Sequence, residues 1–223
     1  LPWPAAAHRR NSRVPKLLPH LFFSAPHVRA SLYLDSESRL GAAVNVSAVV
    51  RELLTDCGAG FAAQAHKTRG VHVLREFRAI RDNANSVEPD AVAAQEGQYR
   101  ADQQYMRTLH EFGGVGIDAE LLVRKTDDRP TRQLSEAWMR AYLRGGDRDQ
   151  PAFSYAFEKA VMAPCRRAAA GSARREESCG LSCGQGFVNL VGHAASNDCA
   201  ALQPGAQLTH STEFDRPAWS AKP

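Results

Sequence analysis

The loop "GGDRDQPAF" at residues 145–153 gathers charged and amide side chains directly before an aromatic run. Asp147 and Asp149 supply carboxylates, which can cap a helix, take a proton or stabilise a developing positive charge. Arg148 and Gln150 are not needed for capping, and an arginine beside a helix N-terminus is suited to binding a phosphate or a sugar hydroxyl. The loop is therefore either a turn between two helices or part of an active site.

Two further acids follow a short alternating segment, "SLYLD", near the start of the chain. Asp35 and Glu37 stand where the strand predicted at 31–35 ends. An acid at the carboxyl end of a strand in an α/β sheet faces the crevice in which ligands bind. Carboxylate oxygens also bind divalent cations, which can hold a diphosphate. The two acids are a candidate metal site, and a simple strand-end turn is the alternative.

A basic segment, "HKTRGVHVLRE" at residues 66–76, is the third candidate. Its cations, together with Glu76, either neutralise a leaving diphosphate or belong to the solvated start of a helix. The sequence contains no Gly-rich phosphate loop, no G-x-S-x-G elbow and no H-E-x-x-H pair. The signatures of the common nucleotide hydrolases, serine hydrolases and zincins are therefore missing.

The elements that must position these residues alternate between strands and helices. Apolar patterning predicts strands at 31–35 and 119–124. Helical spacing predicts helices at 47–54, 72–82, 89–112 and 131–144, and another from about 151. Gly145 and Gly146 are expected to end the fourth of these helices in left-handed backbone. This alternation predicts an α/β layered domain.

Composition divides the chain of 223 residues into three regions. Residues 1–30 form a basic arm with five Lys or Arg and no acid, residues 31–163 the α/β domain, and residues 164–223 a tail predicted to be irregular or disordered. The arm is either solvated or contacts phosphate, and its single Trp argues against nucleic acid as a partner. No apolar run reaches the roughly 18 residues that a membrane span needs. A zinc site in the tail is not expected, because no common finger has the spacing of Cys179, Cys183, His193 and Cys199.

Five blocks of the sequence, taken in order, carry a resemblance to a known family. They are Arg13, Lys16 and His20 with "SLYLDSESRL"; His66 and Arg69 with Glu76; Gln95 and Tyr99; "ELLVR"; and "LSEAWMRAYLRGGDRDQPAFSYAF". Together they cover residues 13–158 and resemble the glycosyltransferase-like domain of plant mucilage-related and pollen turgor-defect proteins and of their bacterial relatives. One block alone would be weak, whereas five in the same order are fairly specific.

The resemblance implies a fold like that of the A-type nucleotide-sugar glycosyltransferases (GT-A), with helices flanking a sheet. It implies a nucleotide-sugar donor and an acceptor that is a glycan or another hydroxyl compound. Asp35 would bind the metal, Mn²⁺ or Mg²⁺, or else the sugar of the donor, and Glu37 is the second candidate metal ligand. The sugar or the acceptor would meet the catalytic residues Arg148, Asp149 and Gln150. The diphosphate would face His66, Arg69, Glu76 and Arg124. Plant relatives imply the Golgi lumen, and bacterial relatives imply the cytoplasm.

The chain also departs from the family pattern. Ser36 replaces a glycine after the strand, and Pro151 and Ala152 replace the serine after "RDQ". The strand–helix–strand unit that should hold the nucleotide base would have to precede Leu1, so the domain is expected to be incomplete at its N-terminus. Two hypotheses follow: a glycosyltransferase, or a degenerate, non-catalytic binding module. The enzyme hypothesis expects Asp149→Asn to abolish transfer with little change in thermal stability.

Overall fold

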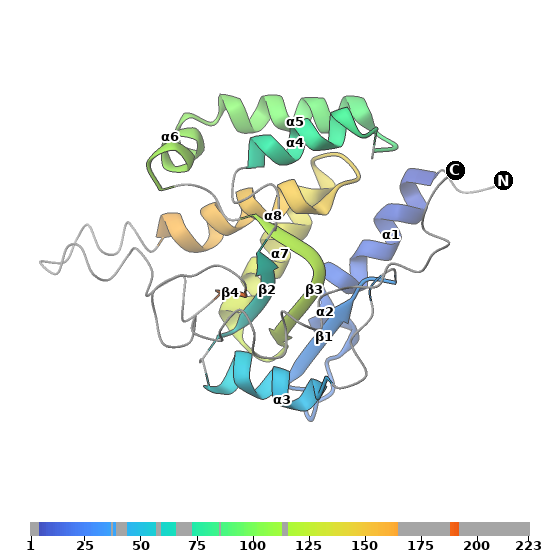
Figure 1. Ribbon diagram of the computed structural model, residues 1–223, viewed down its shortest axis with the longest axis vertical. Helices are drawn as coiled ribbons and strands as arrows, with labels where there is room; N and C mark the ends of the chain where they lie inside the picture. Colours follow the sequence, from blue (N-terminus) through green and yellow to red (C-terminus); the bar gives the residue numbers. More distant parts are fainter. Residues whose placement is uncertain are drawn as a thin grey trace, which may run out of the picture.

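Helices cover both faces of a small sheet, as Figure 1 shows for the computed structural model. The structure describes residues 5–36, 38, 44–56, 59–65, 73–84, 86–112, 116–164 and 188–191. The strands are β1 (Ala30–Leu34), β2 (Phe61–Ala65), β3 (Ile117–Lys125) and β4 (Val188–Val191). The helices are α1 (Ala5–Leu17), α2 (Pro19–Phe22), α3 (Val46–Val50) with its π-helical continuation η1 (Arg51–Asp56), α4 (Val73–Asp82), α5 (Pro89–Ala101), α6 (Gln103–Phe112), α7 (Arg129–Leu143), and α8 (Asp149–Phe157) with its π-helical continuation η2 (Glu158–Met162). Among the described residues, no helix is both long and apolar enough to cross a membrane.

The sheet has the strand order β1-β3-β2-β4. β3 pairs antiparallel with β1 on one side and with β2 on the other, and β4 runs parallel to β2. The α/β class and the strands β1 and β3 are confirmed, whereas β2 was missed and β4 lies in the tail predicted to be irregular. Because β1 and β3 are antiparallel, the parallel-sheet argument that placed Asp35 at a ligand crevice does not apply, and the GT-A fold stays a prediction.

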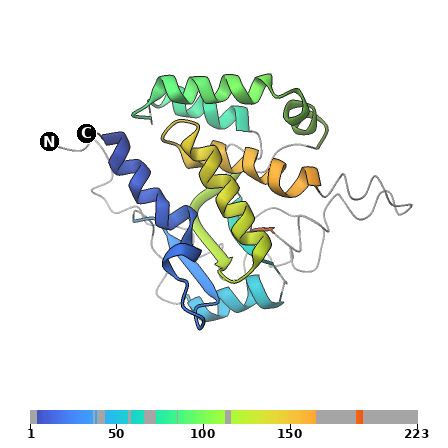
Figure 2. The same cartoon turned by 180° about the vertical axis from the view of Figure 1, so that it is seen from behind.

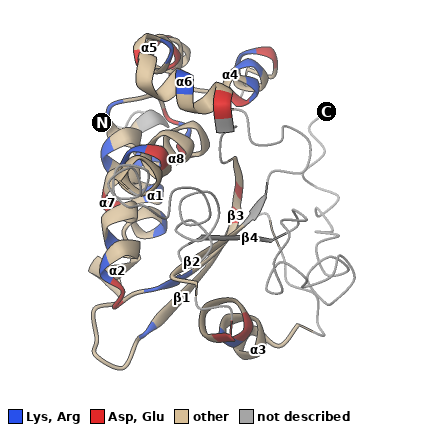
Figure 3. Cartoon of the chain, turned by 90° about the vertical axis from the view of Figure 1, so that its left-hand side faces the viewer, with Lys and Arg blue, Asp and Glu red and all other residues tan. Residues whose placement is uncertain are grey.

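Hydrophobic clusters hold the helical layers on the sheet (Figure 3). One face of the sheet packs against α1, α7 and α8 and buries Phe61, Trp138 and Phe153. The rings of Phe61 and Phe153 stack with centroids 5.4 Å apart. The opposite face packs against α3 and η1 through Leu54 and Val123. A third cluster joins α4, α5 and α6 to α8. Burial of this apolar surface is the main force that holds the layers together.

The segment predicted as one helix from 89 to 112 is two helices that meet at Asp102. The backbone of Asp102 leaves the helical region, and its Oδ1 accepts a hydrogen bond from the Tyr105 N–H at 2.9 Å, as a capping residue does. Its Oδ2 accepts from the Tyr155 hydroxyl at 2.8 Å and lies 2.7 Å from Lys159 Nζ. These contacts with α8 and η2 fix the break, which is why sequence periodicity alone missed it.

The turn between α7 and α8 needs small residues for a reason other than the one expected. Neither Gly145 nor Gly146 has left-handed backbone, so the prediction of a left-handed helix end was wrong. A Cβ atom at Gly145 would lie 2.1 Å from Gln95, and one at Gly146 would lie 2.3 Å from Val92. Gly146 therefore leaves room for the backbone of α5 at Val92, and Gly145 leaves room for the buried Gln95 side chain.

Candidate functional site

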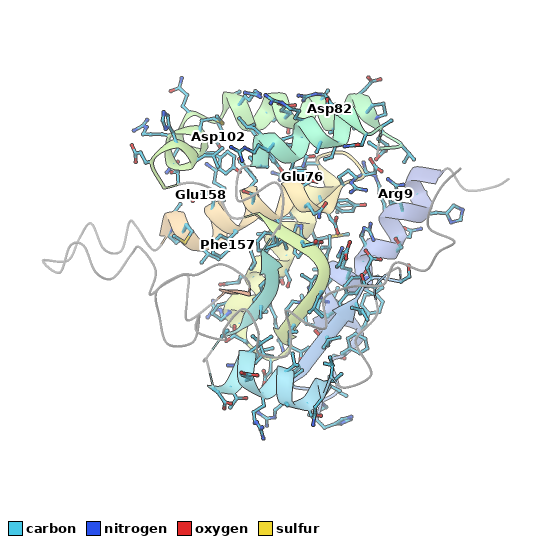
Figure 4. All side chains as sticks on the ribbon, viewed as in Figure 1. Arg9, Glu76, Asp82, Asp102, Phe157 and Glu158 are labelled. Carbon is cyan, nitrogen blue, oxygen red and sulfur yellow. The ribbon has the colours of Figure 1, made fainter. Side chains whose placement is uncertain are left out.

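Basic residues of α1 pair with the acids of the loop between α7 and α8. Figure 2 shows α1 and α7 side by side, and Figure 4 labels Arg9 on α1. Arg9 donates a hydrogen bond to Asp147, and Lys16 Nζ lies 2.6 Å from Asp149 Oδ2. α1, which belongs to the basic arm at 1–30, is thus folded against the domain, and the alternative of a merely solvated arm is wrong for these residues.

Asp149 is buried, with only 4% of its surface exposed. Besides Lys16, Arg13 reaches it, with Nε 3.5 Å from Oδ2. Trp138 fixes the backbone at this point, because its indole N–H donates to the Asp149 carbonyl at 2.7 Å. The cap position of α8 belongs to Arg148, and Asp149 lies in the first turn with its carboxylate paired to α1. The interpretation of Asp149 as an N-cap is therefore wrong.

Asp147 does not cap α8 either. It is fully buried and accepts hydrogen bonds from the Ser86 hydroxyl, from the Val87 N–H at 3.3 Å and from Arg9. The loop acids thus have different partners: Asp147 links α1 to the segment before α5, and Asp149 binds the middle of α1. Both carboxylates hold the α7–α8 turn against neighbouring elements.

Both loop acids are stronger acids than usual. Burial alone would raise the pKa of Asp149, but the charges of Lys16 and Arg13 outweigh it and hold the pKa below the ordinary 3.8. Burial likewise opposes ionisation of Asp147, and the hydrogen bonds from Ser86, Val87 and Arg9 lower its pKa below the same value. Both side chains are therefore carboxylates at neutral pH.

These shifts predict loss of stability in acid. A carboxyl group with a lowered pKa in the folded state stabilises the fold above its unfolded pKa, and this stabilisation disappears as the pH falls through the folded pKa. The melting temperature is expected to fall as the pH drops below about 4. Asp147→Asn should lower the melting temperature at pH 7 and make its decrease between pH 7 and pH 3 smaller. Asp127→Asn, at an exposed acid, is the control, and an equal decrease in all three proteins would contradict the assignment.

Asp35 lies near the same cation as Asp149, although the two acids are far apart in sequence. Asp35 follows β1, where its N–H donates to the Glu120 carbonyl at 2.8 Å and its Oδ1 accepts from the Ser36 N–H at 2.9 Å. Burial opposes ionisation of Arg13, yet the charges of Asp149 and then Asp35 outweigh it and raise the pKa of Arg13. Both carboxylates therefore lie on the same side of the molecule, within electrostatic reach of one guanidinium.

Tyr33, on β1, lies close to the same charged residues. Burial, and then the charge of Asp35, raise the pKa of the Tyr33 hydroxyl, and Asp149 also contributes. Lys16 Nζ lies 5.0 Å from the centre of its ring, a distance suited to a cation–π contact. We call Arg13, Lys16, Tyr33, Asp35 and Asp149 the charged cluster. It joins α1, β1 and the start of α8.

The other predicted site residues are placed as follows. Arg124 lies on β3, is 1% exposed, and has its pKa lowered to about 9 by burial. Glu76 is buried on α4, in the helical layer next to α8 (Figure 4). Arg148 and Gln150 are half-buried at the start of α8. Outside the described residues lie Glu37, His66, Arg69 and the cysteine and histidine residues considered for zinc.

The described residues provide a limited fit to a divalent metal. Among them, no group of three His, Cys, Asp or Glu side chains comes together to hold an ion. Asp35 offers one carboxylate, whose Oδ1 already accepts a hydrogen bond. Mg²⁺ commonly takes one or two carboxylates and completes its coordination with substrate phosphates and water. Asp35 fits that limited role, and the predicted second ligand, Glu37, lies beyond the described part.

Gln95 and Tyr99, which match the third block of the family resemblance, hold the loop that carries Asp149. Gln95 is 1% exposed, and its Nε2 donates to the Tyr99 hydroxyl at 2.8 Å. Its Oε1 accepts from the Gly146 N–H at 3.3 Å. The block therefore positions the α7–α8 turn from α5.

The sequence assigned no specific role to Arg13, Lys16 or Tyr33 of the charged cluster. A signal was present, because Arg9, Arg13 and Lys16 fall at i, i+4 and i+7, on one face of a helix that contains no acid. A helix face with three basic residues and no acid is expected to pack against acidic residues from another part of the chain. The sequence does not say that this partner lies more than a hundred residues downstream, at Asp149.

A groove of about 400 Å³ lies elsewhere, between α5, α7 and the α8–η2 helix. Tyr155, Arg144 and Lys159 are among the residues that line it, and it includes no member of the charged cluster. The groove is therefore separate from the site assembled around Asp149.

Comparison with known proteins agrees with the resemblance in the sequence. The family model described as "TOD1/MUCI70, glycosyltransferase-like domain" matches residues 2–168. Comparisons with curated proteins and with solved structures gave no match. The matched range contains α1 and every residue of the charged cluster. The chain therefore belongs to the TOD1/MUCI70 family of glycosyltransferase-like domains.

Proposed function

We propose that the protein is a glycosyltransferase that transfers a sugar from a nucleotide-sugar donor to an acceptor hydroxyl. The observation that carries the proposal is the electrostatic coupling of both Asp35 and Asp149 to Arg13, within a family of glycosyltransferase-like domains. Carboxylates within electrostatic reach of a guanidinium can bind both parts of such a donor. The acids suit the sugar hydroxyls or a metal, and the cation suits the diphosphate.

In the proposed reaction the acceptor oxygen forms a bond to the anomeric carbon of the donor sugar. The bond from that carbon to the diphosphate breaks, and its electron pair leaves with the nucleoside diphosphate. The acceptor hydroxyl loses its proton to a base. Positive charge develops on the sugar ring and negative charge on the leaving group, so both signs of charge are needed at the site.

Asp149 is better suited to stabilise charge than to take the proton. An efficient general base has a pKa near the working pH, whereas Lys16 and Arg13 hold the pKa of Asp149 below its ordinary value despite burial. A carboxylate that stays ionised can stabilise the developing positive charge of the sugar. Arg148 and Gln150, its neighbours at the start of α8, would contact the sugar or the acceptor.

The positive groups of the site would serve the diphosphate. Arg13 belongs to the charged cluster, and the predicted residues His66, Arg69 and Arg124 would add to it, with Glu76 holding the cations in place. If Mn²⁺ or Mg²⁺ binds, Asp35 with Glu37 would hold it, and the ion would neutralise charge on the leaving diphosphate. Arg13 itself would orient the donor and stabilise the departing group.

One observation favours the second candidate, a degenerate binding module. Asp149 is 4% exposed and already engaged by Lys16 at 2.6 Å, so a ligand reaches it only if α1 shifts. A module that has lost catalysis could keep this ion pair purely to hold its fold.

Calorimetry with a panel of nucleotide sugars in the presence of Mn²⁺ separates the two candidates. The wild-type chain is expected to bind at least one donor, and Asp35→Ala is expected to weaken that binding at least tenfold because it removes the metal or sugar ligand. Asp127→Ala, which removes an exposed acid at the start of α7, is the matched control and should bind like the wild type. Absence of heat with every donor would contradict the transferase proposal and support the degenerate module.

A further inference from the structure

The proposed function makes no use of the groove between α5, α7 and the α8–η2 helix. Figure 2 shows α5 above α7 and the α8–η2 helix. The volume of the groove, about 400 Å³, is within the usual range for sites that bind small ligands. Such sites combine an apolar lining with a few polar groups that orient the ligand, and the groove has both.

Small side chains on two neighbouring helices make room for the groove. Ala137 and Ala141 come from α7, and Ala156 and Ala160 from the α8–η2 helix, each pair four residues apart. Ala160 belongs to η2, which is π-helical. π-Helical turns within a longer helix are uncommon and are frequent at functional sites. These four methyl groups suit an apolar side of a ligand.

The charged side chains that line the groove are all positive. They are Arg140, Arg144 and Lys159, and no acid of the described part of the chain is among the lining residues. Arg140 lies 3.7 Å from Glu136, and Lys159 lies 2.7 Å from Asp102, which Figure 4 labels. Arg144 forms no ion pair with any described residue. One uncompensated positive charge therefore remains, which matches a single carboxylate better than a doubly charged phosphate ester.

The hydroxyl of Tyr99 is a hydrogen-bond donor that the fold leaves unused. Gln95 Oε1 accepts from the Gly146 N–H, so its Nε2 is the atom that donates to the Tyr99 hydroxyl, at 2.8 Å. The proton of this hydroxyl has no acceptor among the residues that the structure describes. Tyr99 is 4% exposed, and buried hydroxyls normally have partners. Since Tyr99 lines the groove, an oxygen of a ligand there can accept this proton.

The unpaired cation and the unused donor lie in the same part of the groove. The ring of Tyr155 stacks on that of Tyr99, with centres 4.3 Å apart. Burial raises the pKa of the Tyr155 hydroxyl to about 12, and the positive charge of Arg144 acts against this shift. Arg144 is therefore within electrostatic reach of the tyrosine pair, and a ligand of moderate size can meet both the cation and the donor.

We propose that this groove binds a sugar acid that carries a single carboxylate. The alanine methyl groups suit the C–H face of a sugar ring, Tyr99 and the exposed amide of Gln98 suit its hydroxyls, and Arg144 suits the carboxylate. No residue of the charged cluster lines the groove, so the ligand occupies a site of its own. The proposal does not rest on sugar transfer.

The test uses the full chain and sodium glucuronate, with dissociation constants measured by NMR titration. The wild type is expected to bind glucuronate about tenfold more tightly than glucose, which has a similar ring without the charge, because hydrogen bonds to charged groups are stronger. Glucose 6-phosphate, with its second negative charge, should bind no more tightly than glucuronate. Equal binding of glucose and glucuronate, tighter binding of glucose 6-phosphate, or no binding of glucuronate would overturn the proposal.

Replacement of Arg144 tests the contact with the carboxylate. Arg144→Gln should weaken glucuronate binding about tenfold and leave glucose binding unchanged, because it removes the charge and keeps a polar side chain. The matched control is Arg129→Gln, at an exposed arginine at the other end of α7, which should bind both sugars like the wild type. If Arg144→Gln bound glucuronate as tightly as the wild type, the ligand would lie elsewhere and the proposal would be wrong.

A second variant tests the space itself. Ala141→Leu places a larger side chain in the groove and should weaken the binding of glucuronate and of glucose alike, because leucine occupies room that the ligand needs. Wild-type affinity for glucuronate in this variant would also overturn the proposal. Arg144 is exposed, so Arg144→Gln should melt close to the wild-type temperature and decides the question even if the leucine variant does not fold. Loss of sugar transfer would not bear on either result, since both variants lie outside the charged cluster.

Discussion

Replacement of Lys16 by methionine is expected to lower the free energy of unfolding by about 3–5 kcal/mol. Lys16 is 2% exposed, and its ammonium group lies 2.6 Å from Asp149. Methionine fills a similar volume but leaves the buried carboxylate of Asp149 with Arg13 at 3.5 Å as its remaining cation on α1. Removal of one partner from a buried ion pair is costly because the other charge stays out of water. Urea unfolding followed by circular dichroism measures the loss.

Arg140→Met is the matched control for this experiment. Arg140 also forms an ion pair, with Glu136 at 3.7 Å, but the Arg140 side chain is more than half exposed and the Glu136 side chain is about half exposed. Exposed pairs at this helical spacing contribute about 0.3–0.5 kcal/mol, so the control should lose no more than that. A loss below about 1 kcal/mol for Lys16→Met would mean that Lys16 does not hold Asp149 in the folded protein.

Patterns within single elements were sufficient to predict most of the helices and two strands. The alternation in "SLYLD" and the buried run in "AELLVR" predicted β1 and β3, and the helical spacing at 131–144 predicted α7. β2 was missed because "FAAQA" contains three alanines, which have no preference for strands. Its place in the sheet comes from pairing with β3, and such pairing is a property of the whole fold rather than of the segment.

The candidate site was predicted only in part, because its contacts, like the pairing of β2, join segments that are distant in the chain. The charged loop at Asp147 and Asp149 was recognised from its residue types, and in the structure the charges of Asp149 and Asp35 both act on the Arg13 guanidinium. The roles of the loop acids were misjudged because helix capping is a local explanation, whereas their partners Arg9 and Lys16 come from the opposite end of the domain. Likewise, Gly145 and Gly146 are explained by the close approach of α5, which local turn chemistry does not reveal.

The second large effect is expected on the rate of sugar transfer when the Asp149 carboxylate is removed. Asp149→Asn is expected to lower kcat for sugar transfer by about 10²–10³-fold, because it removes a charge that would stabilise the transition state. From the sequence, thermal stability was expected to stay nearly unchanged. The structure predicts a clear loss instead, since Lys16 and Arg13 would then lie next to a neutral side chain.

A double variant separates these two effects. In Lys16→Met/Asp149→Asn both members of the buried pair are neutral, so most of the stability lost in either single variant should return. Transfer by the double variant, measured with the donor that calorimetry identifies, should remain at least 100-fold below the wild type, because the carboxylate is still missing. If stability and transfer both returned together, Asp149 would serve only to hold α1 in place. The proposed stabilisation of positive charge on the sugar by Asp149 would then be wrong, because the sugar would react without a carboxylate at this position.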